Sequence, residues 1–173
     1  LHDTGSLPTD HIESVTGDDG QLDLAALSDG LRAEREQGIT IDVAYRFFST
    51  DTRSYVLADT PGHERYTRNT FTGASNAHVA VVLVDAQHGL QRQTRRHARI
   101  ASLVGIKHVV AAVNKIDLVD FSGERFAAVK ADLDELALQV GIDEITAIPV
   151  AARRGDNVVH RSPSTPWYTG PTL

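Results

Sequence analysis

At 173 residues with 41% hydrophobic and 23% charged side chains, the chain has the size and composition of one globular domain, and it lacks the apolar run of roughly 20 residues that a membrane-spanning helix needs. Its 17 basic and 23 acidic residues give a formal net charge of -6, which argues against a broad nucleic-acid-binding surface. The absence of cysteine excludes disulfides and thiolate metal sites and, with no signal-peptide pattern, favours a cytoplasmic protein.

The first 30 residues show little sign of regular structure. They mix Gly, Asp, Ser and Pro with few periodic apolar positions, and residues 16–20 have the composition of a turn. The sequence contains no methionine. We therefore expect the chain to be a piece of a longer protein that is truncated at its N-terminus.

Alternating apolar residues predict a strand over residues 39–48. A polar stretch at 49–54 predicts a turn, and the apolar run after it predicts a second strand over 55–58. The two segments are therefore expected to be consecutive strands joined by a short polar loop.

Three later segments are apolar and rich in valine or isoleucine, as is typical of strands buried on both faces of a parallel sheet. They cover residues 79–84, 109–113 and, more weakly, 145–150. Apolar residues at spacings of three and four predict a helix over 126–140 that ends at Gly141. Strands alternating with helices predict an α/β fold with a mostly parallel sheet covered on both sides, whose ligands bind beyond the carboxyl ends of the strands.

A first polar motif, Asp-Thr-Pro-Gly-His, directly follows the strand predicted over 55–58. The Asp59 carboxylate can hold Mg²⁺ through bound water, and the Gly62 N–H can approach a terminal phosphate closely because glycine has no side chain. His63 follows in the same turn. Its ring is compatible with a water-orienting group, a base or a packed side chain, whereas the other seven histidines show no metal-ligand spacing.

A second motif, Asn-Lys-Ile-Asp, follows the buried strand predicted over 109–113. Asp117 can accept hydrogen bonds from two N–H groups on the guanine edge, a pattern that adenine does not offer. The stem of Lys115 can cover the base, and Asn114 can brace the loop. A base without those donors would leave the carboxylate buried and unpaired, so the motif predicts selectivity for guanine.

A third motif, Arg-Glu-Gln-Gly-Ile-Thr at residues 35–40, lies at the start of the first predicted strand. The Thr40 hydroxyl can bind Mg²⁺ and its N–H can contact a terminal phosphate, so the loop would be ordered only while that phosphate is present. Each of the three motifs alone is compatible with an ordinary turn or loop. Their order and their positions at strand ends together predict a site for Mg²⁺ and GTP.

The three motifs resemble those of translation-factor-type GTPases, in which residues 35–40 would be switch I, 59–63 switch II and 114–117 the guanine-specificity loop. The resemblance implies a P-loop NTPase-type G domain with three α/β/α layers and a mostly parallel sheet over residues 1–160. It implies that the first strand and the phosphate loop of that domain are missing, and that residues 161–173 are an exit linker toward a β-barrel domain.

The resemblance also implies roles for individual residues. Thr40 would bind Mg²⁺, Asp59 would contact the ion through water, and Gly62 would bind the γ-phosphate of GTP. His63 would orient the attacking water. The residues expected to contact GTP through its base lie in two loops: Asn114, Lys115, Asp117, Ala151 and Ala152.

Further segments are similar to the GTPase (large) subunits of bacterial sulfate adenylyltransferases: residues 29–46, 66–69, 93–97, 155–159 and 165–168. In that family the GTPase subunit partners a small subunit that transfers an adenylyl group from ATP to sulfate, and GTP hydrolysis drives this unfavourable reaction. The implied function is GTP hydrolysis coupled to formation of adenylylsulfate and pyrophosphate in sulfate assimilation, with neither nucleic acid nor a membrane as partner.

Two features depart from the family pattern. No Gly-x-x-x-x-Gly-Lys-Ser/Thr phosphate loop occurs in the 173 residues. The Ser-Ala pair expected after the last strand is replaced by Ala151 and Ala152, whose backbone N–H can still contact the guanine oxygen. Because a phosphate cradle and an interior strand are missing, we expect the chain alone to fold poorly, to bind GTP weakly or not at all and to be inactive.

Two other interpretations remain open. An elongation-factor-like protein that delivers aminoacyl-tRNA to ribosomes would share most of the three motifs, but residues 44–48 and 165–168 and the acidic charge favour the sulfate branch. A degenerate binding module that does not hydrolyse GTP is suggested only by the missing phosphate loop.

Overall fold

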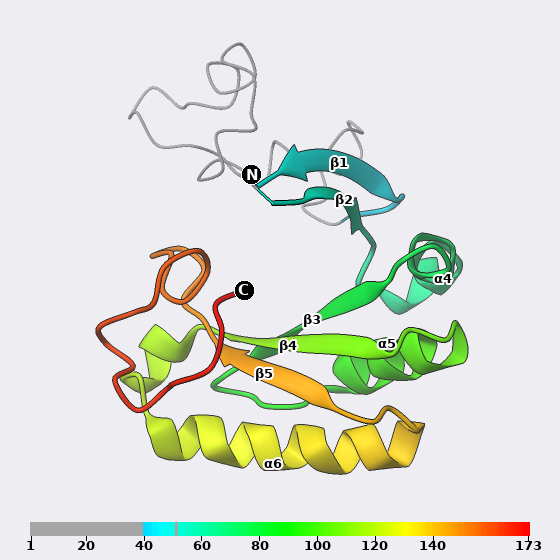
Figure 1. The fold of residues 1–173 in the computed structure, drawn as a ribbon. Helices are drawn as coiled ribbons and strands as arrows, with labels where there is room; N and C mark the ends of the chain where they lie inside the picture. The colour runs from blue at the N-terminus through cyan, green and yellow to red at the C-terminus, as the bar shows by residue number, and fades with distance from the viewer. Residues whose placement is uncertain (1–39, 51) are drawn as a thin grey trace. The chain divides into compact units, whose positions relative to one another are not determined.

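The computed structural model describes residues 40–50 and 52–173. They divide into two compact units, the first ending at Asn76 and the second beginning at Ala77. The first unit contains a sheet of two antiparallel strands and the second a sheet of three parallel strands (Figure 1). The predicted α/β class with a mostly parallel sheet is therefore confirmed.

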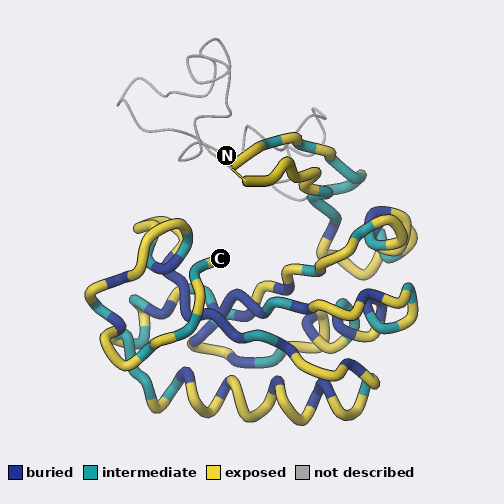
Figure 2. Tube along the Cα trace, viewed as in Figure 1, coloured by how far each residue is buried: buried dark blue, intermediate teal, exposed yellow. Residues whose placement is uncertain are grey.

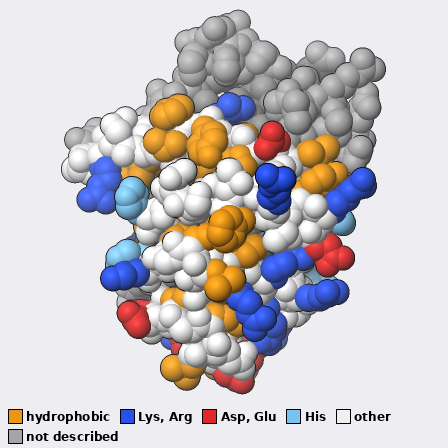
Figure 3. Space-filling model, turned by 90° about the vertical axis from the view of Figure 1, so that its right-hand side faces the viewer, with side chains coloured by type: hydrophobic (Ala, Val, Ile, Leu, Met, Phe, Trp, Pro, Cys, Tyr) orange, Lys and Arg blue, Asp and Glu red, His pale blue; other side chains and the backbone are white. Residues whose placement is uncertain are grey.

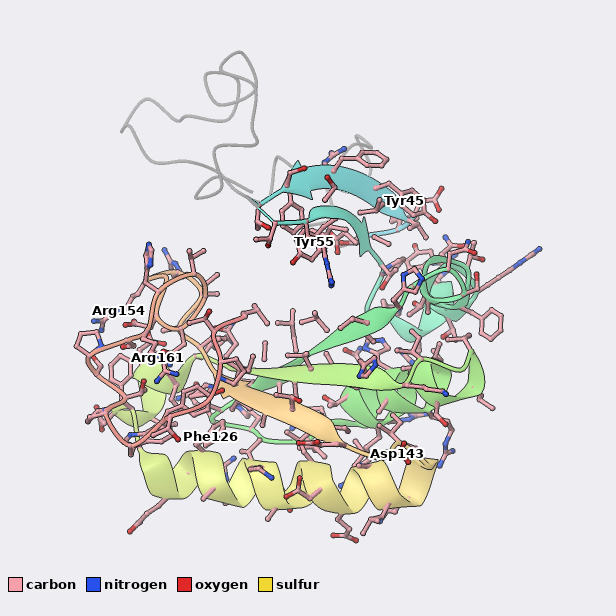
Figure 4. All side chains as sticks on the ribbon, viewed as in Figure 1. Tyr45, Tyr55, Phe126, Asp143, Arg154 and Arg161 are labelled. Carbon is pink, nitrogen blue, oxygen red and sulfur yellow. The ribbon has the colours of Figure 1, made fainter. Side chains whose placement is uncertain are left out.

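The described part of the first unit is built on a hairpin of β1 (Ala44–Ser49) and β2 (Ser54–Asp59). The polar loop between the strands lies where the sequence predicted it. The rings of Phe48 and Tyr55 stack across the hairpin with their centroids 4.9 Å apart. Tyr45 and Tyr55 lie on the two strands of the hairpin (Figure 4), and the stacking of Tyr55 on Phe48 helps to hold the strands together.

The first strand begins later than the sequence predicted. Residue 39 lies outside the described residues, and strand pairing starts only at Ala44. The reason is the length of the partner strand, because β2 ends shortly before Pro61, which has no N–H to donate to a ladder. The Ile41 carbonyl instead accepts a hydrogen bond from Asn69 Nδ2 at 2.8 Å.

A short 3-10 helix, η1 (Glu64–Tyr66), leads into α4 (Thr67–Ala74), which packs on β2. The contact is close at Gly73, where a Cβ atom would overlap the methyl group of Thr60 and lie 3.2 Å from Val43 Cγ1. Only glycine therefore allows α4 to approach the chain at this distance.

We expect Gly73→Ala to lower the free energy of unfolding of the full-length protein by about 1–3 kcal/mol, because the added methyl group overpacks against Thr60, whose β-branched side chain cannot rotate away easily. Urea denaturation measures the change, with Thr72→Ala at an exposed position of the same helix as the control. Helix propensity alone predicts the opposite sign, so a more stable Gly73→Ala protein would contradict the close packing.

The second unit contains β3 (Val79–Asp85), β4 (His108–Asn114) and β5 (Ile145–Pro149), in that order and all parallel. The three predicted strands are confirmed and agree with these bounds to within one residue at each end. Among their valines, Val84, Val109 and Val113 are almost fully inaccessible.

Two helices cover one face of this sheet. The first, α5 (Arg92–Leu103), packs on β3, and α6 (Gly123–Val140) packs on β5 and contacts α5. The Ser122 side chain caps α6 by accepting from the Arg125 N–H at 3.2 Å, and Gly141 ends it with a left-handed φ of 75°, as predicted. The buried stripe of α6 consists of Phe126, Val129, Leu133, Leu136 and Ala137.

The other face of the sheet is covered in part by the C-terminal segment. Tyr168 packs against a buried cluster formed by Ala112, Ile148 and Val150. Figure 2 shows the buried positions concentrated in the sheet and along the side of α6 that faces it. On β3, by contrast, several side chains of this second face are exposed: Val79, Val81 and Leu83.

Residues 161–173, predicted to be an exit linker, pack against the second unit for much of their length. The indole N–H of Trp167 donates to the Phe121 carbonyl at 2.9 Å. The rings of Trp167 and Tyr168 lie 5.3 and 5.8 Å from that of Phe126, near the start of α6 (Figure 4). These aromatic contacts attach the segment to the domain, and the further domain expected after it stays a prediction.

Asn157 fastens the same segment to the end of β5. Its side chain is buried and donates from Nδ2 to the Pro149 carbonyl at 2.8 Å and to Thr165 Oγ1 at 2.9 Å. Its Oδ1 accepts from the Ser162 N–H at 2.8 Å. The backbone of Asn157 is left-handed, with φ 56°, which asparagine tolerates better than most residues.

The surface of the described residues mixes charged and apolar side chains. On the face drawn in Figure 3, Lys and Arg side chains lie among acidic and hydrophobic ones. None of the helices in residues 40–50 and 52–173 combines the length and the apolarity needed to cross a bilayer.

Candidate functional site

The carboxyl ends of the three parallel strands meet at one edge of the second sheet. Asp85 ends β3 and lies in register with Asn114, which ends β4. The Ala86 N–H donates to the Asn114 carbonyl at 2.8 Å, so the ladder continues into the loops. This edge is where an open parallel sheet binds its ligand.

Asn114 joins the loop after β4 to the loop after β5. Its Oδ1 accepts hydrogen bonds from the Lys115 N–H at 2.8 Å and from the Ala152 N–H at 3.0 Å. One side chain thus fixes two loops that are 38 residues apart in the sequence. Asn114 braces the loop, as the sequence suggested, and a contact of this residue with a nucleotide stays a prediction.

The loop after β4 turns sharply at Lys115, whose φ of 61° is left-handed. Ile116 is fully buried and donates from its N–H to the Val150 carbonyl at 3.2 Å, which anchors the following 3-10 turn, η2 (Ile116–Val119). Asp117, half-buried, occupies the first turn of η2. The Asp117 carboxylate therefore lies in a turn that is anchored by the buried Ile116.

Asp85 forms an ion pair with Lys115, from Oδ2 to Nζ, at 2.7 Å. Its other oxygen, Oδ1, accepts from the Gln87 N–H at 2.8 Å and lies 3.3 Å from His88 Nδ1. Desolvation of the carboxyl raises its pKa, but the hydrogen bonds from Lys115, Gln87 and His88 and the Lys115 charge outweigh desolvation and lower the pKa of Asp85 to about 2. Asp85 is thus ionised at neutral pH.

The loop after β5 holds Ala151 and Ala152 in a tight turn. The Gly155 N–H donates to the Ala151 carbonyl at 2.9 Å, and the left-handed φ of 81° at Gly155 allows the chain to turn back. Because the Ala152 N–H already donates to Asn114, a contact of this N–H with a guanine oxygen would be a shared hydrogen bond.

In the first unit, the turn after β2 is anchored to α4. The half-buried Asp59 ends β2, and Pro61 behind it is fully buried. The Pro61 carbonyl accepts from the buried Thr70 hydroxyl at 2.7 Å. Gly62 is exposed on the outside of this anchored turn, and Thr40 is half-buried ahead of β1.

His63 caps η1 with its side chain. Its Nδ1 accepts from the Arg65 N–H at 3.2 Å, and the residue is exposed. A neutral imidazole whose Nδ1 accepts a hydrogen bond carries its proton on Nε2. In that neutral form the ring would present an N–H donor at Nε2, and the role of His63 in hydrolysis stays a prediction.

Comparison with known proteins places the chain in a family. The family model described as the elongation factor Tu GTP binding domain matches residues 3–161. The chain belongs to the elongation factor Tu GTP-binding domain family. The crystal structure of the bacterial selenocysteine-specific elongation factor EF-Sec resembles it with a TM-score of 0.65 and 28% identity, over 88% of this chain and 24% of that one.

Curated relatives of this domain family are more similar in sequence. The chain is 53% identical over its whole length to sulfate adenylyltransferase subunit 1 of Saccharophagus degradans, and it covers 38% of that protein. It is 55% identical, again over its whole length, to the bifunctional enzyme NodQ of Azospirillum brasilense, of which it covers 29%. The chain thus spans less than two fifths of the relatives it matches.

The structure brings one group of the predicted residues of the GTP-binding domain together in the second unit. Asn114, Lys115 and Asp117 share the loop after β4. The loop after β5, which contains Ala151 and Ala152, lies beside it and is joined to it by the hydrogen bond from the Ala152 N–H to Asn114. A second group belongs to the first unit: Thr40, Asp59, Gly62 and His63. That both groups converge on one nucleotide stays a prediction.

Sequence reasoning missed Asp85 and Arg125 as members of this loop cluster. Arg125 Nε donates to the Ala86 carbonyl at 2.6 Å, and its Nη2 donates to the Gln87 carbonyl at 3.1 Å. The signal for Asp85 was available, since an aspartate directly after a predicted strand is the same pattern that singled out Asp59. Nothing in the sequence pattern pointed to Arg125.

The oxygen ligands predicted for Mg²⁺ agree with the preference of that ion. Thr40 offers a hydroxyl that would bind the ion directly, and Asp59 a carboxylate that would contact it through water, and both are hard oxygen groups. Across residues 40–50 and 52–173, however, no three His, Cys, Asp or Glu side chains gather into a group that could hold a metal. Mg²⁺ at this place would therefore share its coordination with phosphate oxygens and water, as is usual for this ion.

Proposed function

We propose that this chain is the GTP-binding part of the GTPase subunit of a sulfate adenylyltransferase. The observation that carries the proposal is the 53% identity, over the whole chain, to relatives named sulfate adenylyltransferase subunit 1. The rigid loop of Asn114, Lys115 and Asp117 at the strand ends supports it, because that loop has the side chains that guanine recognition requires. The likeness to EF-Sec, at 28% identity, supports the elongation-factor alternative less strongly.

Guanine recognition is assigned to the second unit. The Asp117 carboxylate would accept hydrogen bonds from the two N–H groups of the guanine edge, and Asn114 would keep the loop in shape through its contact with Ala152. The methylene stem of Lys115 would cover one face of the base. Adenine would leave the half-buried carboxylate without its partners, so ATP would not compete for this part of the protein.

Phosphate binding and hydrolysis are assigned to the first unit. The N–H groups of Thr40 and Gly62 would contact the terminal phosphate, and the Nε2–H of His63 would orient the attacking water. Mg²⁺, held by the Thr40 hydroxyl and through water by Asp59, would neutralise phosphate charge when bound. We also propose that the protein acts in the cytoplasm with a small adenylyl-transferring subunit as its partner.

The proposal is tested with the full-length protein and its small-subunit partner. We expect pyrophosphate and adenylylsulfate to form from ATP and sulfate faster when GTP is added than when GDP is added, because hydrolysis supplies the driving force. A GTP-independent rate would contradict the coupling. Binding of aminoacyl-tRNA by the GTP-loaded protein, measured in parallel, would instead support the elongation-factor alternative.

A further inference from the structure

The ion pair between Asp85 and Lys115 connects the ends of two strands. The atoms Oδ2 and Nζ lie 2.7 Å apart, although the residues are 30 positions apart in the sequence. The Lys115 side chain is 53% exposed and the Asp85 side chain only 20%. The carboxylate is therefore the fixed partner, and the ammonium is the group whose position depends on it.

The backbone around Asp85 is held from several sides. The Gly89 N–H donates to the Asp85 carbonyl at 2.8 Å, and the Gln87 N–H to Asp85 Oδ1 at 2.8 Å. Arg125, in the first turn of α6, donates to the Ala86 and Gln87 carbonyls at 2.6 and 3.1 Å. The turn after β3 is thus a rigid support, and Asp85 cannot follow a lysine that moves away.

We propose that Asp85 is a positioning residue for base recognition, which holds the Lys115 ammonium and thereby directs the Lys115 stem to the place where the guanine ring lies. The inference rests on the proposed function, because it requires a guanine nucleotide at the loop of Lys115. Lysine has a flexible four-carbon stem, and its covering of a base costs conformational entropy unless the far end is already fixed. The carboxylate supplies that fixed end.

The ionisation of Asp85 supports this role. Hydrogen bonds and the charge of Lys115 keep the pKa of the carboxyl low, at about 2, in spite of its desolvation. The carboxylate is consequently ionised throughout the pH range in which nucleotide binding is measured. The exposed Lys130–Asp134 pair on α6, also 2.7 Å long, is a matched ion pair away from the loops.

The experiment compares GDP with inosine diphosphate, which lacks the 2-amino group, by isothermal titration calorimetry on the full-length protein. We expect Asp85→Asn to weaken binding of both nucleotides equally, by roughly two- to fivefold. The substitution loosens the Lys115 stem, which covers the face of the ring and makes no contact with the 2-amino group on its edge. Asp85→Glu, which keeps the charge, should restore part of the loss. Asp134→Asn should leave both affinities unchanged.

A double substitution tests whether Asp85 acts through Lys115. Lys115→Ala should weaken GDP binding, and adding Asp85→Asn to it should cause no further loss. Unchanged affinity in Asp85→Asn, a further loss in the double variant, or a changed ratio of GDP to inosine diphosphate affinity would overturn the assignment. If the unsubstituted protein does not prefer GDP to ADP, the proposed function itself fails, and this inference fails with it.

Discussion

Replacing Asp117 with Asn in the full-length protein is expected to lower its affinity for GTP by about 100-fold or more, because the amide cannot accept from both N–H groups of guanine and places its own N–H against one of them. The same amide can donate to the 2-oxygen of xanthine, so xanthosine triphosphate should gain affinity. Calorimetric titration with each nucleotide measures the affinities for GTP and for xanthosine triphosphate.

Asp120 provides the matched control for this prediction. It lies in the same loop, directly after η2, with an exposed side chain and a left-handed φ of 52°. Asp120→Asn should bind GTP as the unsubstituted protein does, because its charge is solvated and no contact to the base is assigned to it. Equal losses in both variants would show that loop charge, rather than recognition of the guanine edge, determines affinity.

The second large effect is expected from His63→Ala, which should slow GTP hydrolysis by about 100-fold while changing GTP affinity little. The reason is the ring's position: Nδ1 is occupied by the Arg65 N–H, and Nε2–H is left to orient water. Phosphate release in a single turnover, together with nucleotide affinity, separates the two effects. His63→Gln, a neutral donor, should recover part of the rate.

His108→Ala serves as a control, because His108 is exposed at the start of β4, opposite the carboxyl end of that strand. It should hydrolyse GTP at the normal rate. A parallel loss of affinity and rate in His63→Ala would make His63 a structural cap of η1 and remove it from the hydrolysis step.

The fold was predictable where apolar periodicity and burial coincide. The valine-rich run of β4 lies between β3 and β5 in the sheet, and Gly141 ends α6 because a left-handed residue is needed there. The start of β1 was not predictable from its own alternation, since pairing depends on where β2 ends. The packing of Trp167 was missed because irregular segments carry no periodic signal, and its contact with Phe121 spans 46 residues.

Part of the candidate nucleotide site could likewise be predicted from the sequence, and part could not. Asp117 and Asn114 were recognisable because they follow a buried strand as a short motif, and the hydrogen bonds of Asn114 explain why an amide stands there. The partnership of Asp85 with Lys115 was hidden, because it arises from strand register, which sets Asp85 beside Asn114. A motif search sees each loop separately, whereas the sheet brings them together.

The most direct measurement is a crystal structure of the full-length protein with a non-hydrolysable GTP analogue and Mg²⁺. We expect the Asp117 carboxylate within hydrogen-bond distance of N1 and N2 of the guanine, and the Thr40 hydroxyl on the Mg²⁺ beside the terminal phosphate. A base bound away from the loop of Asn114 and Asp117, or a Thr40 and Gly62 that face away from the nucleotide, would contradict this account.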